Sequence, residues 1–189
     1  MELRNKKGEW DSLNHVLVFG GTGMLSVAVS WLGGQCKNLV VYARNEKKAQ
    51  SIRQPFTFYE LDYKNTEDVR KAIMEALAEN GEVDLVLVWV HGTAPHAVQT
   101  IMDEVNRRQA KKWRLVHVKG SSSSKEAIEK KEKTNGSCIY QEVFLGFIVE
   151  ESRSRWLTHE EISRGTIEAI ANPISRHLIG TLTPWDARP

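Results

Sequence analysis

Short apolar runs rich in β-branched residues recur along the chain, and each is followed by a turn signal. Continuous apolar runs of this length predict strands that are buried on both faces of a sheet. A weaker run near His177–Leu182 predicts a last strand. The six clearer runs are His15–Phe19, Asn38–Ala43, Phe56–Leu61, Val83–Val90, Trp113–Val118 and Cys138–Val149.

Helical patterns separate most of these runs. The clearest helix begins at Thr66 and ends at Asn80-Gly81, where glycine accepts the left-handed cap conformation at little cost. A capping box, Thr158–Glu161, opens another helix that extends to about Ala171. The remaining predicted helices cover Met24–Leu32, about Glu46–Arg53, and a stretch with Pro95 in its first turn whose apolar stripe is Val98, Ile101, Met102 and Val105.

Alternation of strands and helices predicts a fold of the α/β class, with a parallel sheet between two helical layers. Because crossovers between parallel strands are right-handed, the expected topology is a single doubly wound, three-layer αβα domain over residues 1–189. Residues 1–14 are polar and are set aside as a flexible leader. Ligands of such folds bind beyond the carboxyl ends of the strands.

Residues 120–136 interrupt the alternation. Four serines, Ser121–Ser124, precede a segment dense in both charges, Lys125–Lys133. Glu126 with Lys130, and Glu129 with Lys133, have the favourable i,i+4 order of a solvated helix. We therefore expect a short exposed helix here.

Composition narrows the function classes. The 189 residues include 26 Lys and Arg against 24 Asp and Glu, a net charge of +2, which does not favour a nucleic-acid or membrane surface. No apolar run approaches the ~20 residues that span a bilayer. Cys36 and Cys138 are expected to be reduced thiols outside any metal site. These features predict a cytoplasmic protein that binds neither nucleic acid nor membrane.

A glycine cluster supplies the sharpest chemical signal. The residues Gly20-Gly21-Thr22-Gly23-Met24-Leu25 follow a buried strand and open a helix. Glycines in this context let the backbone turn tightly and approach a phosphate, and the helix N-terminus offers unpaired N–H groups to an anion. A purely structural turn is the alternative. We predict that these six residues bind the diphosphate of a dinucleotide.

The end of the second strand indicates which dinucleotide. Sites for NAD place a carboxylate about 20 residues beyond the glycines. Here that position holds Arg44-Asn45, and a guanidinium can fork onto a phosphate. NADP is therefore the predicted cofactor, with NAD as the alternative.

The next two strand ends supply further candidates. Asp62-Tyr63 follows the third strand, where the carboxylate can accept from the adenine amino group. After the fourth strand, Gly92 would let the backbone pass the nicotinamide ribose, and His91 is a candidate for cofactor contact and acid–base catalysis. Ordinary polar turn contacts are the alternative for both positions.

Together these segments resemble the short-chain dehydrogenase/reductase family. The resemblance covers roughly Val16–Val149 and includes the serines after the fifth strand. It implies a Rossmann domain that holds NAD(P) for hydride transfer between a carbonyl and an alcohol. By position, one of Ser121–Ser123 matches the catalytic serine of that family, and Ser121 and Ser122 are the catalytic candidates.

The chain departs from the family at its proton donor. The family carries a Tyr-x-x-x-Lys pair, and no tyrosine of this sequence has a lysine four residues later. Three alternatives stay open: an oxidoreductase in which Ser121–Ser123, His91 or Lys119 orients a carbonyl substrate; a non-catalytic module that senses NADP(H); and a nucleotide-free oligomeric scaffold. A homo-oligomer is compatible with each.

Overall fold

The computed structural model describes residues 13–90, 92, 94–120, 134, 136–151 and 153–189. Of the predicted leader, residues 13 and 14 belong to the first strand. The strands are β1 (Leu13–Phe19), β2 (Cys36–Ala43), β3 (Thr57–Glu60), β4 (Leu85–Val88), β5 (Trp113–Lys119), β6 (Cys138–Leu145), β7 (Phe147–Glu150), β8 (Arg153–Trp156) and β9 (Arg176–Ile179). The helices are α1 (Ser26–Gly33), η1 (Glu46–Ser51), α2 (Thr66–Asn80), α3 (Ala97–Arg108), α5 (His159–Ala171) and η2 (Trp185–Ala187).

Within the described residues, seven parallel strands form the central sheet in the order β3-β2-β1-β4-β5-β6-β9. This is the strand order of a doubly wound Rossmann sheet, and it confirms the predicted fold class. Strand order reverses between β1 and β4, so the carboxyl ends of these two strands flank the topological switch point.

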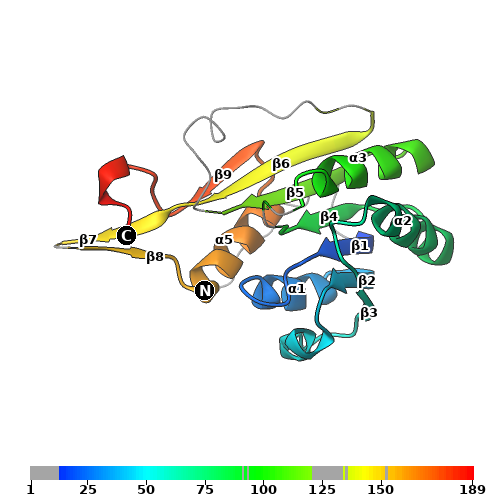
Figure 1. Cartoon of the computed structure of the whole chain (residues 1–189), viewed down its shortest axis with the longest axis horizontal. Coiled ribbons are helices and arrows are strands. Elements are labelled where there is room, and N and C mark those ends of the chain that lie inside the picture. The colour runs from blue at the N-terminus through cyan, green and yellow to red at the C-terminus, as the bar shows by residue number, and fades with distance from the viewer. Residues whose placement is uncertain (1–12, 91, 93, 121–133, 135, 152) are drawn as a thin grey trace.

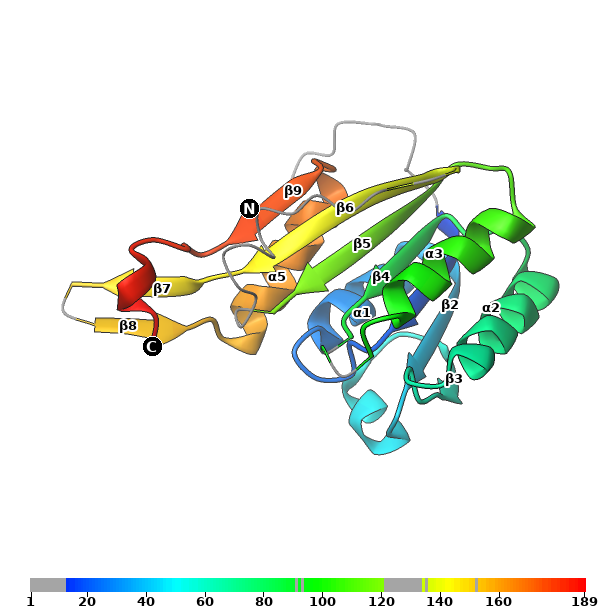
Figure 2. The same ribbon diagram turned by 45° about the horizontal axis from the view of Figure 1, so that its top comes forward.

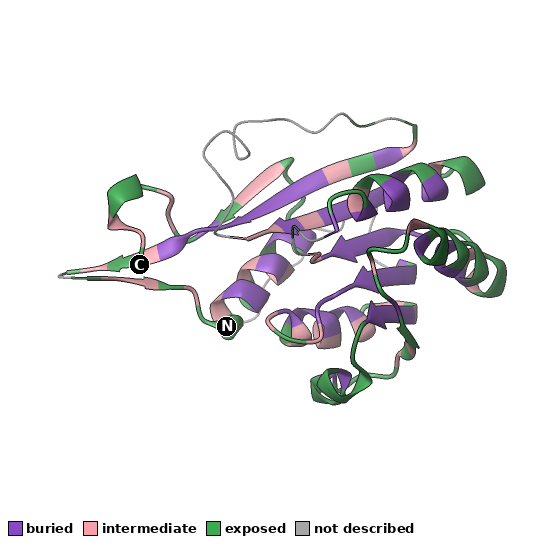
Figure 3. Cartoon of the chain, in the orientation of Figure 1, coloured by how far each residue is buried: buried purple, intermediate pink, exposed green. Residues whose placement is uncertain are grey.

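Helices cover both faces of the sheet. Figures 1 and 2 show α2 and α3 on one face and α1 and α5 on the other. Two apolar clusters follow from this arrangement, one around Val29 and Ile170 and the other around Ile73 and Ile101. Both sides of the central strands are therefore buried, as Figure 3 shows, which explains why their sequences are continuously apolar.

The predicted stripe of the third long helix packs into the core. Ile101, Met102 and Val105 are buried on α3, and Val98 is half-buried. Pro95 lies before the helix instead of in its first turn. Ala97 N–H donates to the Ala94 carbonyl (3.1 Å), so Pro95 occupies a tight turn that precedes α3. The predicted charged helix after β2 is the 3-10 helix η1, which ends at Ser51.

The predicted sixth strand is interrupted at Gly146. This residue approaches the backbone of Thr181, where an added Cβ would overlap the Thr181 carbonyl oxygen. Beyond it the chain forms β7, which pairs antiparallel with β8 in a separate two-stranded hairpin. Figures 1 and 2 show this hairpin projecting from the carboxyl end of β6. The apolar pattern alone did not predict the interruption or the strand β8.

Strand β9 confirms the weak prediction near His177–Leu182, although it begins one residue earlier and ends at Ile179. The segment predicted as an exposed helix falls almost entirely on residues 121–133 and 135, which lie outside the described residues.

Helix α5 begins with the predicted capping box. The Thr158 side chain accepts from the Glu161 N–H, and the Glu161 carboxylate accepts from the Thr158 N–H (2.8 Å). We expect Thr158→Ala to lower the free energy of unfolding by about 1 kcal/mol, because an orphan helix donor then loses its acceptor. Urea unfolding measures this change. Thr158→Ser keeps the hydroxyl and should stay close to wild type, so an equal loss in both variants would contradict the capping explanation.

Candidate functional site

The turn between β1 and α1 has a backbone that requires glycine. Gly20 and Gly21 adopt φ of 85° and 88°, in the left-handed region that disfavours side chains. An added Cβ at Gly20 would overlap the carbonyl oxygen of Trp89, and one at Gly21 would lie 3.0 Å from Val29. The two glycines therefore let β1 pass directly beside the end of β4 and turn into α1.

Gly23 serves a different purpose. An added Cβ there would meet no protein atom within 4 Å, so the missing side chain leaves open space instead of relieving a clash. Helix α1 also begins without a side-chain cap. Within the described part of the chain, the amide groups of Thr22, Gly23 and Met24 donate to no protein acceptor. Free amides at a helix N-terminus beside open space make a cradle suited to an anion.

A cavity of about 310 Å³ opens over this turn, and we call it the glycine-loop cavity. Its charged side chains are Arg44, which follows β2, and Lys48, on η1. No carboxylate stands in the described lining, so the cavity favours a negatively charged ligand. The lining comprises Gly20, Gly21, Thr22, Gly23, Met24, Ala43, Arg44, Asn45, Lys48, Tyr63, Trp89 and His159.

Most of the predicted cofactor residues meet at this cavity. Those that line it are Gly20, Gly21, Thr22, Gly23, Met24, Arg44, Asn45 and Tyr63. Asn45 also caps η1, since its side-chain oxygen accepts from the Lys47 N–H (2.9 Å). Three further lining residues, Lys48, Trp89 and His159, are not among the predicted cofactor contacts. Spacing could have indicated Lys48, four residues after Arg44, whereas no local signal connects His159 with a loop more than 130 residues earlier.

Three predicted contacts lie elsewhere. Leu25 is fully buried in the apolar core, because the residue before α1 points its side chain into the sheet–helix interface. Gly92 is exposed and does not line the glycine-loop cavity. Asp62 lies outside this cavity too, and its Oδ1 accepts from the Lys64 N–H (3.1 Å) in a local turn. The predicted catalytic candidates His91, Ser121 and Ser122 lie outside the described residues.

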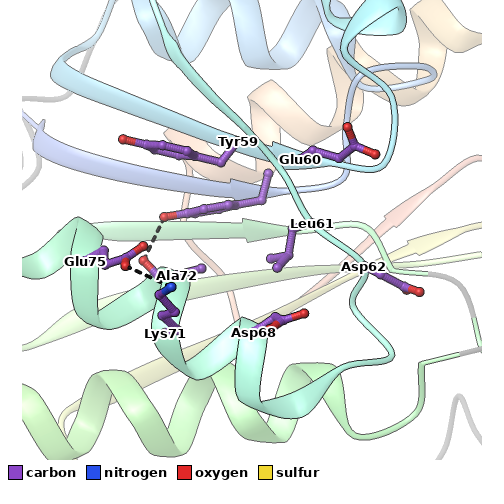
Figure 4. A pocket seen from close by; sticks show the side chains of 9 residues that line it. Tyr59, Glu60, Leu61, Asp62, Asp68, Lys71, Ala72 and Glu75 are labelled. Atoms are coloured by element: carbon purple, nitrogen blue, oxygen red, sulfur yellow. Dashed lines mark hydrogen bonds and ion pairs between the residues drawn. The ribbon is translucent and has the colours of Figure 1, made fainter.

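Asp62 lines a second cavity of about 220 Å³, between β3 and α2. The stacked rings of Tyr42 and Tyr59 line it, and Figure 4 shows the carboxylates of Asp62, Asp68 and Glu75 around the opening. The Tyr42 hydroxyl donates to the Ala72 carbonyl (2.9 Å). Since carboxylates dominate this rim, it does not suit a phosphate.

Tyr63, the tyrosine that lines the glycine-loop cavity, is already hydrogen-bonded within the protein. The Tyr63 hydroxyl donates to the Tyr42 carbonyl (2.7 Å), and burial raises its pKa to about 12. Of the others, Tyr42 and Tyr59 have pKa values raised above the ordinary value, chiefly by burial, and Tyr140 is hydrogen-bonded to His117 (2.8 Å). None of the four tyrosines is therefore placed as a proton donor at this cavity.

Lys119, a candidate for orienting a carbonyl substrate, forms an ion pair with a carboxylate. It ends β5, and its Nζ lies 2.6 Å from Oε1 of the buried Glu142. Arg176 on β9 contacts the other oxygen of the same carboxylate at 2.7 Å. This ion-pair cluster ties β5, β6 and β9 together, a structural use for Lys119.

In the ranges that the structure describes, no three His, Cys, Asp or Glu side chains are grouped to hold a metal ion. No helix among them is long and apolar enough to cross a membrane.

Comparisons with known proteins rest on structure alone, since the sequence matches no family model and no curated protein. A structure titled NADH-dependent reductase A1-R' complexed with NAD superposes with a TM-score of 0.65 at 12% identity, over 90% of this chain and 96% of that one. A short-chain dehydrogenase/reductase from Burkholderia phymatum in complex with NAD gives 0.65 at 14% identity, over 92% and 90% of the two chains.

A short-chain dehydrogenase from Oenococcus oeni also gives a TM-score of 0.65, at 12% identity and over 92% of this chain and 99% of that one. At such low identities a likeness establishes the fold and no more. The chain therefore has the Rossmann fold in the form found in short-chain dehydrogenase/reductases.

Proposed function

We propose that this protein binds NADP(H) in the glycine-loop cavity and is a small oxidoreductase of the short-chain dehydrogenase/reductase type. The observation that carries the proposal is the pairing of an anion cradle with a lining that contains cations and no carboxylate among the described residues. The solved structures of the same fold include two that are complexed with NAD, which supports a nicotinamide dinucleotide as the ligand.

The site matches the two anionic parts of NADP separately. The free amides of Thr22, Gly23 and Met24 would take the diphosphate, and the space left by Gly23 lets a phosphate approach the backbone. Arg44 and Lys48 would take the 2′-phosphate that distinguishes NADP from NAD. A carboxylate that would accept from the free 2′-hydroxyl of NAD is absent from the described lining, which favours NADP.

When bound, the dinucleotide would supply or accept a hydride. Its partner would be a small carbonyl or alcohol substrate at the carboxyl edge of the sheet, oriented by Ser121, Ser122 or His91. The described residues would hold the diphosphate and the 2′-phosphate in a cavity whose described lining contains no carboxylate.

A non-catalytic NADP(H)-sensing module is the second candidate. The tyrosines favour it: the sequence lacks the Tyr-x-x-x-Lys pair, and Tyr63 is held protonated by burial and engaged with the Tyr42 carbonyl. Oxidation of NADPH with a panel of aldehydes and ketones separates the candidates. Turnover that His91→Ala or Ser122→Ala abolishes supports the enzyme, and binding without turnover supports the sensor.

Binding itself is tested by tryptophan fluorescence, because Trp89 lines the cavity. Titration with NADP and with NAD should quench the emission and saturate. Failure of both dinucleotides to bind at millimolar concentration would overturn the proposed function.

Arg44→Asp tests the cofactor preference. We expect it to weaken NADP binding by a factor of about 10–100, because a charge-assisted contact is replaced by repulsion, and to change NAD binding far less. Lys47→Asp is the matched control, since it makes the same charge change three residues away, outside the cavity lining. Equal losses for NADP and NAD would remove Arg44 from the 2′-phosphate site.

A further inference from the structure

His159, the first residue of α5, brings a second helix to the glycine-loop cavity. Helix α5 contacts α1, β6 and β9, whereas η1, which carries Lys48, contacts β3. The two side chains therefore reach the cavity from opposite sides of the glycine turn. Because Arg44 and Lys48 stand on the β2–β3 side, a dinucleotide with its 2′-phosphate at these two residues would extend its other half toward His159.

The position of His159 is tied to the glycine turn itself. Ser163, one turn later on α5, donates its hydroxyl to the Met24 carbonyl (2.8 Å). The capping box at Thr158 fixes the first turn of the helix, and the guanidinium of Arg155 grips the Glu161 carboxylate with two nitrogens, at 2.9 and 3.0 Å. The hydrogen bond from Ser163 holds α5 against the glycine turn, and the capping box holds the first turn of the helix. His159 therefore lies beside the anion cradle before any ligand binds.

The acidic residues next to His159 are occupied with other partners. Glu160 pairs with Arg164 (2.6 Å), and Glu161 accepts from Arg155 and the capping box. The hydrogen bonds from Arg155 and Thr158 hold the pKa of Glu161 at about 2. The carboxylates of this first turn are thus neutralised by arginines, so they do not cancel the attraction of the cavity for a phosphate.

We propose that His159 is a diphosphate-binding residue, whose ring nitrogen donates to the phosphate on the nicotinamide side of the dinucleotide. This inference rests on the proposed function. The residues of this one cavity would then have separate roles. Arg44 and Lys48 select the 2′-phosphate, and His159 holds the diphosphate that NADP and NAD share. Its loss should therefore affect both dinucleotides alike.

The test measures dissociation constants for NADP, NAD and adenosine 2′,5′-bisphosphate, which carries the 2′-phosphate but no diphosphate bridge. His159→Ala should weaken NADP and NAD binding by a similar factor, about tenfold, and leave binding of the bisphosphate unchanged. His159→Gln, which restores a donor, should recover most of the affinity. His96→Ala is the matched control, because His96 is an exposed histidine at the start of α3 that does not line the cavity.

Two results would overturn the inference while leaving the proposed function intact: unchanged NADP and NAD affinity in His159→Ala, or an equal loss for the bisphosphate, which would indicate a general structural effect. Absence of dinucleotide binding by the wild-type protein would instead overturn the proposed function. Thermal unfolding of each variant confirms that the fold is retained, which is expected because His159 is exposed.

Discussion

Gly20→Ala is expected to lower the free energy of unfolding by about 2–5 kcal/mol and to abolish dinucleotide binding. The residue has φ of 85°, a conformation that an alanine adopts only with strain, and its new Cβ would overlap the backbone oxygen of Trp89. That oxygen cannot withdraw easily, because the Trp89 N–H is held by the Phe19 carbonyl (2.8 Å) at the centre of the sheet. Urea unfolding and a fluorescence titration measure the two losses.

Gly23→Ala is the control that separates folding from binding. Its Cβ would meet no protein atom within 4 Å and its φ is not in the left-handed region, so stability should change by less than about 0.5 kcal/mol. The methyl group would nevertheless project into the anion cradle and weaken dinucleotide binding. Wild-type stability and affinity in Gly20→Ala would contradict the geometry of the turn, and unchanged affinity in Gly23→Ala would contradict the cradle.

The free energy of unfolding should fall as pH decreases from about 6.5 to 5, by up to about 1.4 kcal/mol per pH unit for each histidine whose pKa is lowered in the folded protein. Burial, aided by the charge of Lys119, lowers the pKa of His117 to about 3 from its usual 6.5. In this pH window the His117 imidazole binds a proton in the unfolded chain but stays neutral in the folded protein, so acid favours unfolding. Burial also lowers the pKa of His15, which adds to the same trend.

His117→Asn should flatten this dependence, because the side chain no longer titrates, and a residual slope from His15 should remain. Tyr140→Phe removes the hydroxyl that contacts His117 but keeps the ring in the core, so it should preserve the slope if burial is the main cause. Unfolding in urea at pH 5.0 and pH 6.5 gives the comparison. An unchanged slope in His117→Asn would show that another group controls the acid sensitivity.

Local patterns determined much of this protein from the sequence. The apolar runs predicted the strands of the central sheet, and the signals at Gly81 and Thr158 located a helix end and a helix start. The glycine cluster and Arg44 predicted one wall of the cavity. Each of these inferences needs only neighbours within a few residues, because periodicity, caps and tight turns are local properties of the backbone.

The tertiary structure decided what depends on distant partners. Strand β6 ends before Gly146 because the backbone of Thr181 lies against this glycine. The apolar run Cys138–Val149 continues across Gly146 and does not indicate that contact. Leu25 points into the core although it belongs to the glycine motif, and His159 reaches the cavity although it lies far along the chain. A sequence pattern records which residues alternate, whereas the packing of α5 on α1 determines which side chains share a site.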